Sequence, residues 1–557
     1  MIRMNRIIQL CKQNYFLLSA PLIFLSFPSY DVWILKGFPF FAWISLVPVF
    51  LYVKGKGFKD AYLVSFLTGL AGNLLTYEWI GNFGAAMPGG YFIIVIMLNL
   101  SLSVFFAVKI TAAELLSQRH ERFRALIFPS VWIIVDWIQS IGFLAFPWTY
   151  WGHSQYPFTP FIQMASVTGI LGINFVVILF NYLFSEFVGA GGLRRRPLGS
   201  LVSLKEAKRV AAAAVFVLAV TLCGAVILAV SGRGDKKDLR VAMVQSCISP
   251  WENWSENRFR YLAELKRYTE QALADNPEFI IWSESATLET ISYSYETGML
   301  NDFEKEVLAL AQTADRPLLT GEIGVVEDFR RFGLSRYPQN NAVLINNLGE
   351  VVRTYPKINL VPFGEWFPYE KWFPAVKQLT ERMGGSSFVP GTQPVMFDVR
   401  GHRFGVLICY EGIFYRLCRS YRRLGAEFLV NITNDGWTRT YRGHMQHFSA
   451  SIFRAVENGV WYVRAGNTGY TAIIDPYGRV RESFPILTKG YLAGDIDFSL
   501  DHRTVYTAAG DIILYLAMAF LCVLAGITLY KSIHERIINP KAPSPSRGEG
   551  RGGGEQA

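Results

Sequence analysis

The stretch "GVLICYEGIF", from Gly405 to Phe414, joins an apolar run to a polar end. The run "GVLI" is typical of a buried strand, and Cys409, Tyr410 and Glu411 follow it at once. A cysteine in an apolar core is usually inert, because low dielectric disfavours its thiolate. A cysteine at the end of a strand, beside polar groups, can instead be a nucleophile. The stretch therefore predicts a buried strand with a candidate nucleophile at its carboxyl end.

Further apolar runs that end in polar residues lie on both sides of this stretch. Typical strand sequences are "LRVAMVQS", "EFIIWSES", "PLLTGEIGV", "NAVLINN", "EFLVNITND" and "GVWYVRAGN". The stretch "ENRFRYLAELKRYTEQALA" is typical of a helix, and "NNLGEVV" and "DPYGRV" carry hairpin turn signals. Strands that alternate with helices, together with hairpins, predict an α/β domain built on mixed sheets over residues 233–505.

Three reactive side chains close strands in this domain. Glu284 ends "FIIWSE", Lys357 ends "VVRTYPK" and Cys409 ends "VLIC". Reactive groups gather beyond the carboxyl ends of strands in such sheets, so the three can form one site. A carboxylate can take the proton of a thiol, an ammonium group favours the thiolate, and a cysteine can hold an acyl group covalently. Spacing along the chain leaves an alternative open, in which the cysteine is core packing and the two charges are solvated.

The regions outside this domain are dominated by long apolar runs. The chain of 557 residues is 51% hydrophobic and 18% charged, whereas soluble proteins carry about 25% charged residues. Spanning a bilayer takes about 20 apolar residues in a helix. We therefore predict a membrane α-helical bundle of about eight transmembrane helices, seven in residues 1–232 and one in 506–532: near 13–30, 36–53, 60–82, 91–116, 124–142, 159–187, 209–231 and 511–530. Residues 533–557 are predicted to form a disordered tail, which is rich in Pro, Gly and Ser from about Pro540.

Lysine and arginine are unevenly distributed among the predicted loops. They cluster before the first predicted span and after the second, fourth, sixth and eighth, for example in residues 54–59 and 194–196. The alternate loops "NFGAAMPGG" and "FLAFPWTYWGHSQYP" contain neither residue. Because cytoplasmic loops carry the excess of these residues, both termini are predicted in the cytoplasm and residues 233–505 on the opposite side, the periplasm in a bacterium. The net charge of +10 fits this asymmetry better than nucleic-acid binding.

Neither a metal nor a cofactor is expected. The six cysteines show no CxxC spacing and no disulfide framework. His444 and His447 form an HxxH pair without evident further ligands, which favours structural histidines. Cys418 lies in the arginine-rich stretch "LCRSYRR", where its pKa could be lowered without a catalytic role. Glu78 and Asp136 fall within or near predicted spans, where carboxylates are costly.

Longer motifs carry a resemblance to known families. "IIWSESA", "YPKINLVPFGEWFP", "LICYEGIF" and "NITNDGW" resemble the nitrilase (carbon–nitrogen hydrolase) superfamily, which uses a Glu–Lys–Cys triad. "NDGWTRTYRGHMQHFSASIFRAVENG" and "RAGNTGYTAIIDPYGRV", with "FPSYDVW", "FGAAMPGG" and "FPWTYWGHSQYP", are similar to bacterial apolipoprotein N-acyltransferases. The resemblance covers roughly residues 27–514. It implies a nitrilase-like α-β-β-α sandwich beside a helix bundle of the bacterial inner membrane.

The resemblance also implies a reaction and residue roles. Members of the family move an acyl chain from the sn-1 position of a phospholipid, typically phosphatidylethanolamine, to the α-amino group of the diacylglyceryl-cysteine that begins an apolipoprotein. Cys409 would hold the chain as a thioester, Glu284 would act as base, and Lys357 would stabilise the thiolate and the oxyanion. The backbone N–H of Tyr410 would be a further oxyanion donor. The remaining implied residues are two supporting carboxylates and two possible lipid-binding tryptophans: Glu365, Glu411, Trp148 and Trp254.

Alternatives remain open at this point. A membrane-tethered amidase would use the same triad but let water attack the acyl-enzyme. A non-catalytic transporter or scaffold is disfavoured by the intact triad. Trp148 has the alternative of an ordinary interfacial aromatic, and Trp251 lies close enough to Trp254 to blur that assignment. The expected partners are a membrane phospholipid and diacylglyceryl apolipoproteins, with no nucleic acid.

Overall fold

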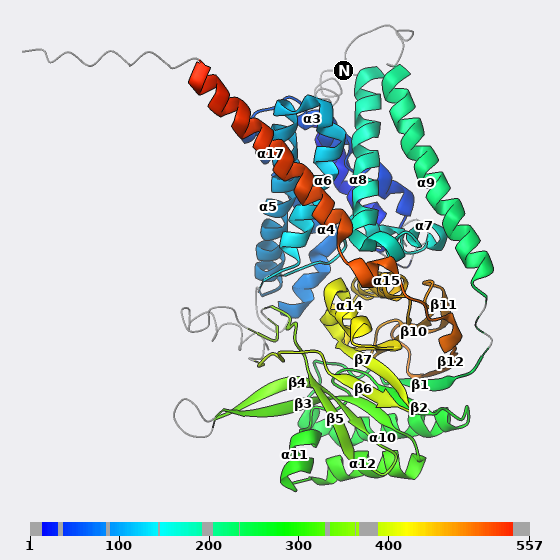
Figure 1. The fold of residues 1–557 in the computed structure, drawn as a ribbon. Coiled ribbons are helices and arrows are strands. Elements are labelled where there is room, and N and C mark those ends of the chain that lie inside the picture. The colour runs from blue at the N-terminus through cyan, green and yellow to red at the C-terminus, as the bar shows by residue number, and fades with distance from the viewer. Residues whose placement is uncertain are drawn as a thin grey trace, which may run out of the picture.

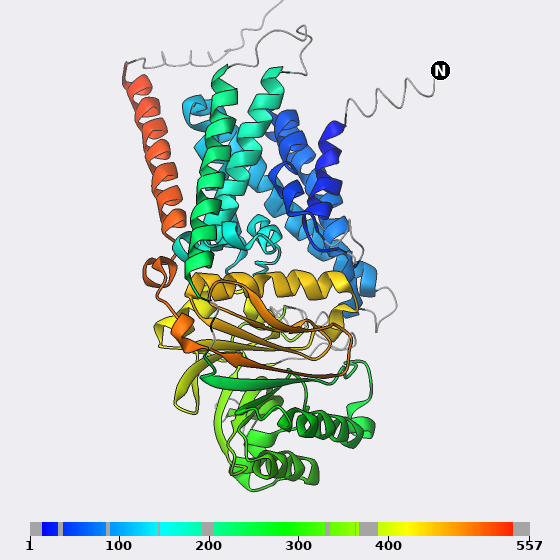
Figure 2. The ribbon, with the colours of Figure 1, turned by 90° about the vertical axis from the view of Figure 1, so that its right-hand side faces the viewer.

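The computed structural model describes residues 14–29, 31, 37–84, 90–142, 145–191, 204–232, 234, 236–328, 335–362, 364–366 and 388–538. They form a bundle of helices that stands on a two-sheet domain (Figures 1 and 2). The first part of the chain builds the bundle, the middle part builds the sheets, and the last long helix returns alongside the bundle.

The bundle combines long and short helices. The long ones are α4 (Phe58–Tyr77), α5 (Gly90–Arg119), α6 (Arg124–Gln139), α8 (Ala165–Gly191), α9 (Leu204–Val230) and α17 (Ile512–Ile538). The short ones are η1 (Tyr15–Leu18), α2 (Ser19–Ser26), η3 (Pro39–Trp43), α3 (Val47–Val53), η4 (Glu78–Gly84), η5 (Glu121–Phe123), η6 (Trp151–Gln155) and α7 (Thr159–Ile162).

Within the described part of the chain, four helices are long and apolar enough to cross a membrane: α5, α8, α9 and α17. The predicted count of about eight spans is not confirmed. The first two predicted spans contain only the shorter apolar helices Tyr15–Ser26 and Pro39–Val53. Helix α6 has 16 residues, and α4 has 20 but includes Lys59, Asp60 and Asn73. An apolar run predicts burial without distinguishing protein from lipid surroundings, so apolar runs alone do not fix the number of spans.

Two six-stranded mixed sheets form the domain beneath the bundle. The first sheet has the order β12 (Gly490–Ile496), β1 (Leu239–Gln245), β2 (Phe279–Trp282), β3 (Leu318–Asp328), β4 (Ser335–Ile345), β5 (Val351–Pro356). The second has the order β11 (Val480–Phe484), β10 (Thr471–Ile474), β9 (Trp461–Gly466), β8 (Phe428–Thr433), β7 (His402–Ile408), β6 (Met396–Val399). Strands β1, β2 and β3 run parallel, as do β7, β8 and β9, and the other pairings are antiparallel. The predicted mixed sheets are confirmed.

The sheets pack face to face between two layers of helices. Phe279 of β2 and Phe404 of β7 meet across the shared core, with ring centroids 5.3 Å apart. Helices α10 (Trp254–Leu273), α11 (Ile291–Thr297) and α12 (Asp302–Ala314) lie beside the first sheet, and α14 (Tyr415–Arg423) and α15 (Tyr441–Asn458) cover the second (Figure 1). Strand β8 is buried along its whole length, as expected for a parallel strand covered on both faces. The layers follow the implied α-β-β-α order.

Helix α15 lies between the second sheet and the bundle (Figure 2), and residues 442–458 are all buried. Its polar side chains therefore contact protein on both sides. Arg442 donates to the carbonyl of Leu75 at 2.7 Å and lies 3.4 Å from the carboxylate of Glu78. At the other end of the helix, Glu457 accepts a hydrogen bond of 2.8 Å from the backbone N–H of Ile170. The bundle thus rests on the sheets through buried polar contacts.

Asp136, the other carboxylate near a predicted span, is paired as well. Its Oδ1 lies 2.5 Å from Lys109 Nζ, and its Oδ2 accepts from Asn174 Nδ2 at 2.8 Å. Asp136 and Lys109 are both buried. A buried charge that lost its partner would be strongly destabilising, so this pair holds α5, α6 and α8 in register.

The end of the chain ties the bundle to the sheets a second time. After η9 (Phe498–Leu500) and α16 (Val505–Ala509), Asp511 pairs with Arg416 of α14 at 2.8 Å. Arg419 Nε donates to the carbonyl of Tyr506 at 3.0 Å. Helix α17 continues to Ile538, so the first part of the predicted tail 533–557 is helical. Residues 539–557 lie outside the described residues.

Candidate active site

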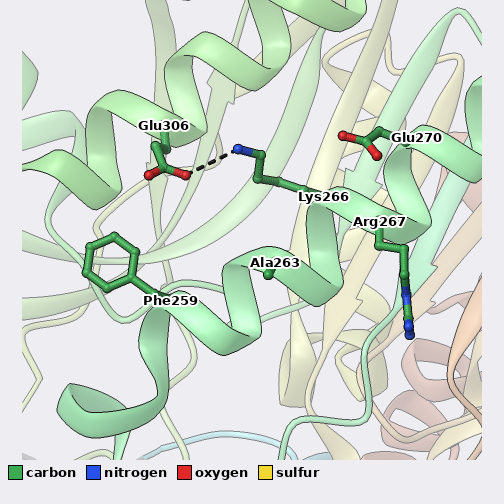
Figure 3. A pocket seen from close by; sticks show the side chains of 6 residues that line it. All are labelled: Phe259, Ala263, Lys266, Arg267, Glu270 and Glu306. Atoms are coloured by element: carbon green, nitrogen blue, oxygen red, sulfur yellow. Dashed lines mark hydrogen bonds and ion pairs between the residues drawn. The ribbon is translucent and has the colours of Figure 1, made fainter.

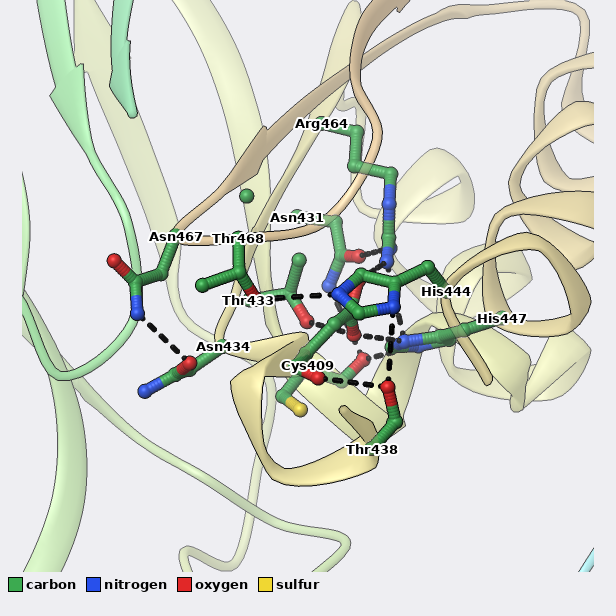
Figure 4. A network of polar contacts seen from close by, with 12 residues as sticks. Cys409, Asn431, Thr433, Asn434, Thr438, His444, His447, Arg464, Asn467 and Thr468 are labelled. Carbon is green, nitrogen blue, oxygen red and sulfur yellow. Dashed lines mark hydrogen bonds and ion pairs between the residues drawn. The ribbon is translucent and has the colours of Figure 1, made fainter. Parts of the chain in front are cut away.

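Cys409 lies at the turn between β7 and η7 (Cys409–Ile413). Its φ of 51° falls in the left-handed region that residues other than glycine rarely adopt. Such a conformation costs about 1–3 kcal/mol and persists where its surroundings hold it. The carbonyl of Cys409 accepts from His447 Nε2 at 3.1 Å and from Asn431 Nδ2 at 3.3 Å, within the network of Figure 4. The turn leaves a half-buried thiol beyond the carboxyl end of the second sheet.

Glu284 and Lys357 come from the first sheet. Each follows the carboxyl end of a strand, β2 for Glu284 and β5 for Lys357. Lys357 Nζ lies 3.3 Å from Glu284 Oε1 and 2.7 Å from Glu365 Oε1. The thiol of Cys409 interacts electrostatically with both Glu284 and Lys357. The structure therefore brings the three residues together between the two sheets.

Opposite charges govern protonation in this site. Burial would lower the pKa of Lys357, but the carboxylates of Glu284 and Glu365 raise it above its usual value. Burial raises the pKa of the Cys409 thiol well above its usual value, and the Glu284 carboxylate raises it further against the opposing effect of Lys357. A thiol with a raised pKa forms little thiolate, so Cys409 needs a general base to react.

Asn340 of β4 completes this charged group, and sequence reasoning missed it. Its Nδ2 donates to Glu284 Oε1 at 2.9 Å and to Glu365 Oε1 at 2.7 Å. The other oxygen of Glu284 accepts from the backbone N–H of Asn434 at 2.8 Å. These bonds hold the carboxylates in place around Lys357. The available signal was the pair "NN" inside a strand, because asparagine is depleted in strands.

Glu411 connects the backbone next to Lys357 with the backbone next to Cys409. The side chain is fully buried, and burial raises the pKa of Glu411 to about 7. Its two oxygens accept four hydrogen bonds of 2.7–3.0 Å from three backbone N–H groups and one hydroxyl: Ile358, Asn359, Ile408 and Tyr355. A single carboxylate thus fixes the separation of the lysine and the nucleophile.

Glu411→Gln should destabilise the protein and slow acylation of Cys409. An amide has one acceptor oxygen, so its NH₂ group would face buried donors, at about 1–3 kcal/mol for each unpaired group. Thermal unfolding and the rate of adduct formation measure the two effects. Glu427→Gln is the control, since Glu427 accepts from the N–H of Arg403 at the other end of β7 but is partly exposed. Similar losses in both variants would contradict the role of Glu411.

The histidines of the HxxH pair belong to a hydrogen-bond network (Figure 4). His447 Nδ1 lies 2.8 Å from Asp435, and His444 Nε2 lies 3.2 Å from Thr468 Oγ1. Burial would raise the pKa of Asp435, but Arg464 at 2.6 Å and then His447 hold it far below its usual range. Among the described residues, no group of three or more His, Cys, Asp or Glu side chains is placed to hold a metal ion.

Tyr410 and Trp148 lie against each other where the sheets meet the bundle. Their rings stack with centroids 6.3 Å apart and an angle of 20° between planes. The hydroxyl of Tyr410 donates to the carbonyl of Ala145 at 2.5 Å. Trp148 is buried beside the nucleophile turn.

Trp254 lies in a different part of the domain. It begins α10, packs in the apolar cluster between α10 and α12, and donates through Nε1 to Glu289 at 3.0 Å. Its neighbour Trp251 instead contacts Trp437, with ring centroids 5.0 Å apart. Trp437 in turn stacks with Phe83 of η4, at 6.4 Å and 7°. Trp251 is therefore linked to the bundle through Trp437, whereas Trp254 is not in this cluster.

Cys418 differs from its prediction. It is fully buried in α14, and burial raises its pKa to about 12. The expectation of a lowered pKa is wrong, because burial outweighs the lowering effect of Arg454. Two arginines of α14 pair with aspartates instead, Arg416 with Asp511 and Arg422 with Asp501. The chain thus places two cysteines close in sequence in different environments.

A separate hollow on the outer face of α10 contains none of these residues (Figure 3). It is lined by exposed or partly exposed side chains, with Lys266 and Glu306 paired at 3.2 Å across it: Phe259, Ala263, Lys266, Arg267, Glu270 and Glu306. Its lining lacks the combination of base, ammonium group and thiol found between the sheets.

Two mixed sheets that bring a carboxylate, a lysine and a cysteine together at their carboxyl ends define an enzyme of the carbon–nitrogen hydrolase class. Residues 240–503 match the carbon-nitrogen hydrolase family, and residues 19–183 match the apolipoprotein N-acyltransferase N-terminal domain. The apolipoprotein N-acyltransferase of Geobacter metallireducens is 31% identical over 528 residues, which cover 93% of this chain and 96% of the relative. The chain belongs to the apolipoprotein N-acyltransferase family.

The chain is also similar to other proteins. Apolipoprotein N-acyltransferase 1 of Treponema denticola is 28% identical over 537 residues, covering 91% of this chain and 95% of the relative. A solved structure, the NitN amidase from Neterenkonia sp. AN1, is 19% identical and covers 48% of this chain and 96% of that chain, with a TM-score of 0.34.

Proposed function

We propose that this chain moves an acyl chain from a membrane phospholipid to the α-amino group of a diacylglyceryl apolipoprotein, through a thioester on Cys409. The observation that carries the proposal is the buried Glu284–Lys357 pair beside the Cys409 thiol, in a member of this family whose sheets adjoin a bundle with apolar helices. We propose phosphatidylethanolamine as the donor and the step as the last in lipoprotein maturation.

The first half-reaction forms the thioester. Glu284 takes the proton of the Cys409 thiol while the sulfur attacks the sn-1 ester carbonyl of the phospholipid. Lys357 and the backbone N–H of Tyr410 stabilise the oxyanion of the tetrahedral intermediate. The ester C–O bond then breaks, and Glu284 returns the proton to the departing hydroxyl of the lysophospholipid.

The second half-reaction releases the chain to the acceptor. The α-amino group of the apolipoprotein attacks the thioester carbonyl, and Glu284 accepts a proton from the attacking nitrogen. The C–S bond breaks, and the Cys409 sulfur regains its proton from Glu284. Lys357 stays charged throughout because two carboxylates flank it, so it offsets negative charge in both steps.

An amidase reading uses the same residues but is less supported, since the relatives that cover nearly the whole chain are named N-acyltransferases. Depletion of this chain from its own cell should leave a model lipoprotein one acyl chain short at its N-terminus, which mass spectrometry measures. An unchanged triacylated N-terminus would count against the acyltransferase. Release of ammonia or free fatty acid without lipoprotein acylation would favour the amidase.

We further propose that the sheets lie in the periplasm and both termini in the cytoplasm of a bacterium. Basic residues pair at the end of the bundle away from the sheets. Lys54 pairs with Glu186 near the end of α8, and Arg124 pairs with Glu114 near the end of α5, each at 2.7 Å. The opposite ends of these helices adjoin the sheets (Figure 2). Positive charge and catalytic domain thus lie at opposite ends of the bundle, as the positive-inside rule requires for this orientation.

A reporter that is active only in the cytoplasm should stay silent when inserted at Gly349. This glycine lies in the turn between β4 and β5, next to exposed Leu348, where an insertion is tolerated. The same reporter fused after Ile538, at the far end of α17, should be active. A strong signal from the Gly349 fusion would overturn the orientation.

A further inference from the structure

Gln446 of α15 makes four hydrogen bonds where the sheets meet the bundle, and its side chain is only 2% exposed. Its carbonyl Oε1 accepts from the indole N–H groups of Trp79 and Trp148, each at 3.2 Å. Its amide Nε2 donates to the carbonyls of Pro28 and Thr76, each at 3.3 Å. Buried N–H groups are costly without an acceptor, so this one amide fixes the orientation of both tryptophans.

Trp148 in turn contacts residues that position the nucleophile turn. One neighbour of its ring is Tyr410, stacked at 6.3 Å, and another is His447, at 5.1 Å between centroids. His447 in turn donates to the carbonyl of Cys409. Tyr410 directly follows Cys409, and its hydroxyl is anchored on Ala145. A change in the position of Trp148 therefore reaches the backbone of Tyr410.

We propose that Gln446 is a positioning residue for the acylation of Cys409, because it holds Trp148 against Tyr410 and so fixes the Tyr410 N–H where the oxyanion forms. The proposal rests on the proposed function in one respect, the thioester on Cys409. An oxyanion donor acts only when it is aligned with the developing charge. Alkylation of the thiol by iodoacetamide forms no oxyanion, so it needs the sulfur but not this donor.

The test compares two reactions of Cys409 in the full-length protein, acylation by p-nitrophenyl butyrate and alkylation by iodoacetamide, each followed by mass spectrometry. Gln446→Met removes all four hydrogen bonds and should slow acylation by about 10- to 100-fold while alkylation stays within about twofold of wild type. Trp148→Phe keeps a ring but removes the indole N–H. It should slow acylation by a smaller factor, again without an effect on alkylation.

Gln163 provides the matched control. It is 5% exposed, and its Nε2 donates to the carbonyl of Tyr477 in the sheet domain at 2.8 Å and to Thr159 at 3.0 Å. Its hydrogen bonds thus cross the same contact at a distance from the two tryptophans. Gln163→Met should leave both reactions of Cys409 at wild-type rates.

Three results would overturn the role of Gln446: equal losses of acylation and alkylation in Gln446→Met, unchanged acylation in that variant, or the same acylation loss in Gln163→Met. Failure of the proposed function would look different. Wild-type protein would then be acylated by p-nitrophenyl butyrate but not by phospholipid, and the comparison of variants would still decide the role of Gln446.

Discussion

Cys409→Ser should lose the acyl-enzyme and at least about 10⁴-fold of the transfer rate, as expected when a nucleophile is removed from a catalytic set. A hydroxyl is far less acidic than a thiol, and Glu284 and Lys357 surround the larger, softer sulfur. Wild-type protein incubated with phospholipid alone should gain one fatty-acyl mass, because the first half-reaction is complete without an amine. Hydroxylamine should remove that mass, since it cleaves thioesters readily. Intact-protein mass spectrometry measures both results.

Cys418→Ser is the internal control for this experiment. Cys418 lies nine positions after Cys409 (418 − 409 = 9), but it is fully buried and its raised pKa keeps it a neutral thiol. The variant should keep both the adduct and the activity. An adduct that survives Cys409→Ser but disappears with Cys418→Ser would show that the acyl chain is carried by the other sulfur.

Glu284→Gln should slow formation of the acyl-enzyme by about 10²–10⁴-fold, the usual contribution of a general base. The amide keeps the size of the side chain but cannot accept the thiol proton. The raised pKa of Cys409 makes the loss severe, because little thiolate forms without a base. Single-turnover acylation by phospholipid, quenched and followed by mass spectrometry, isolates this step from release to the amine.

A second buried carboxylate of the first sheet controls for the substitution itself. Glu322 of β3 is buried and accepts from the backbone N–H of Ser292 at 2.8 Å. None of the hydrogen bonds that Glu322 makes within the described residues involves Glu284, Lys357 or Cys409. Glu322→Gln should leave the acylation rate unchanged. Acylation at the wild-type rate in Glu284→Gln would remove Glu284 from the role of base.

The local sequence was sufficient to predict which segments form strands and which residues lie at their carboxyl ends. Strand sequences alternate with helices, and each of Glu284, Lys357 and Cys409 lies within two residues of the end of a strand. Carboxyl ends of parallel strands meet at one edge of a sheet, so a position in the sequence translates into a position in the site. The distribution of Lys and Arg is a property of the chain as well, and it predicted the orientation that remains to be tested.

The sequence did not predict which residues from distant segments contact the site residues. Asn340 reaches both Glu284, which follows β2, and Glu365, which lies beyond β5, because β4 lies between β3 and β5 in the sheet. Trp251 and Trp254 are equivalent by sequence, but Trp254 begins α10 and packs in its apolar cluster, whereas Trp251 precedes the helix and contacts Trp437. The arginine-rich stretch around Cys418 predicted a lowered pKa, yet burial raises it and outweighs the lowering effect of Arg454.

The sequence by itself determined the class of fold, the family and the identity of the three candidate reacting residues, because apolar periodicity, strand ends and motifs are written in consecutive positions. Only the tertiary structure shows how long each apolar helix is and how the bundle contacts the turn that carries Cys409. Gln446 shows why: its four partners lie in three distant segments of the bundle. A buried amide acquires its function from hydrogen bonds that exist only once those segments are packed together.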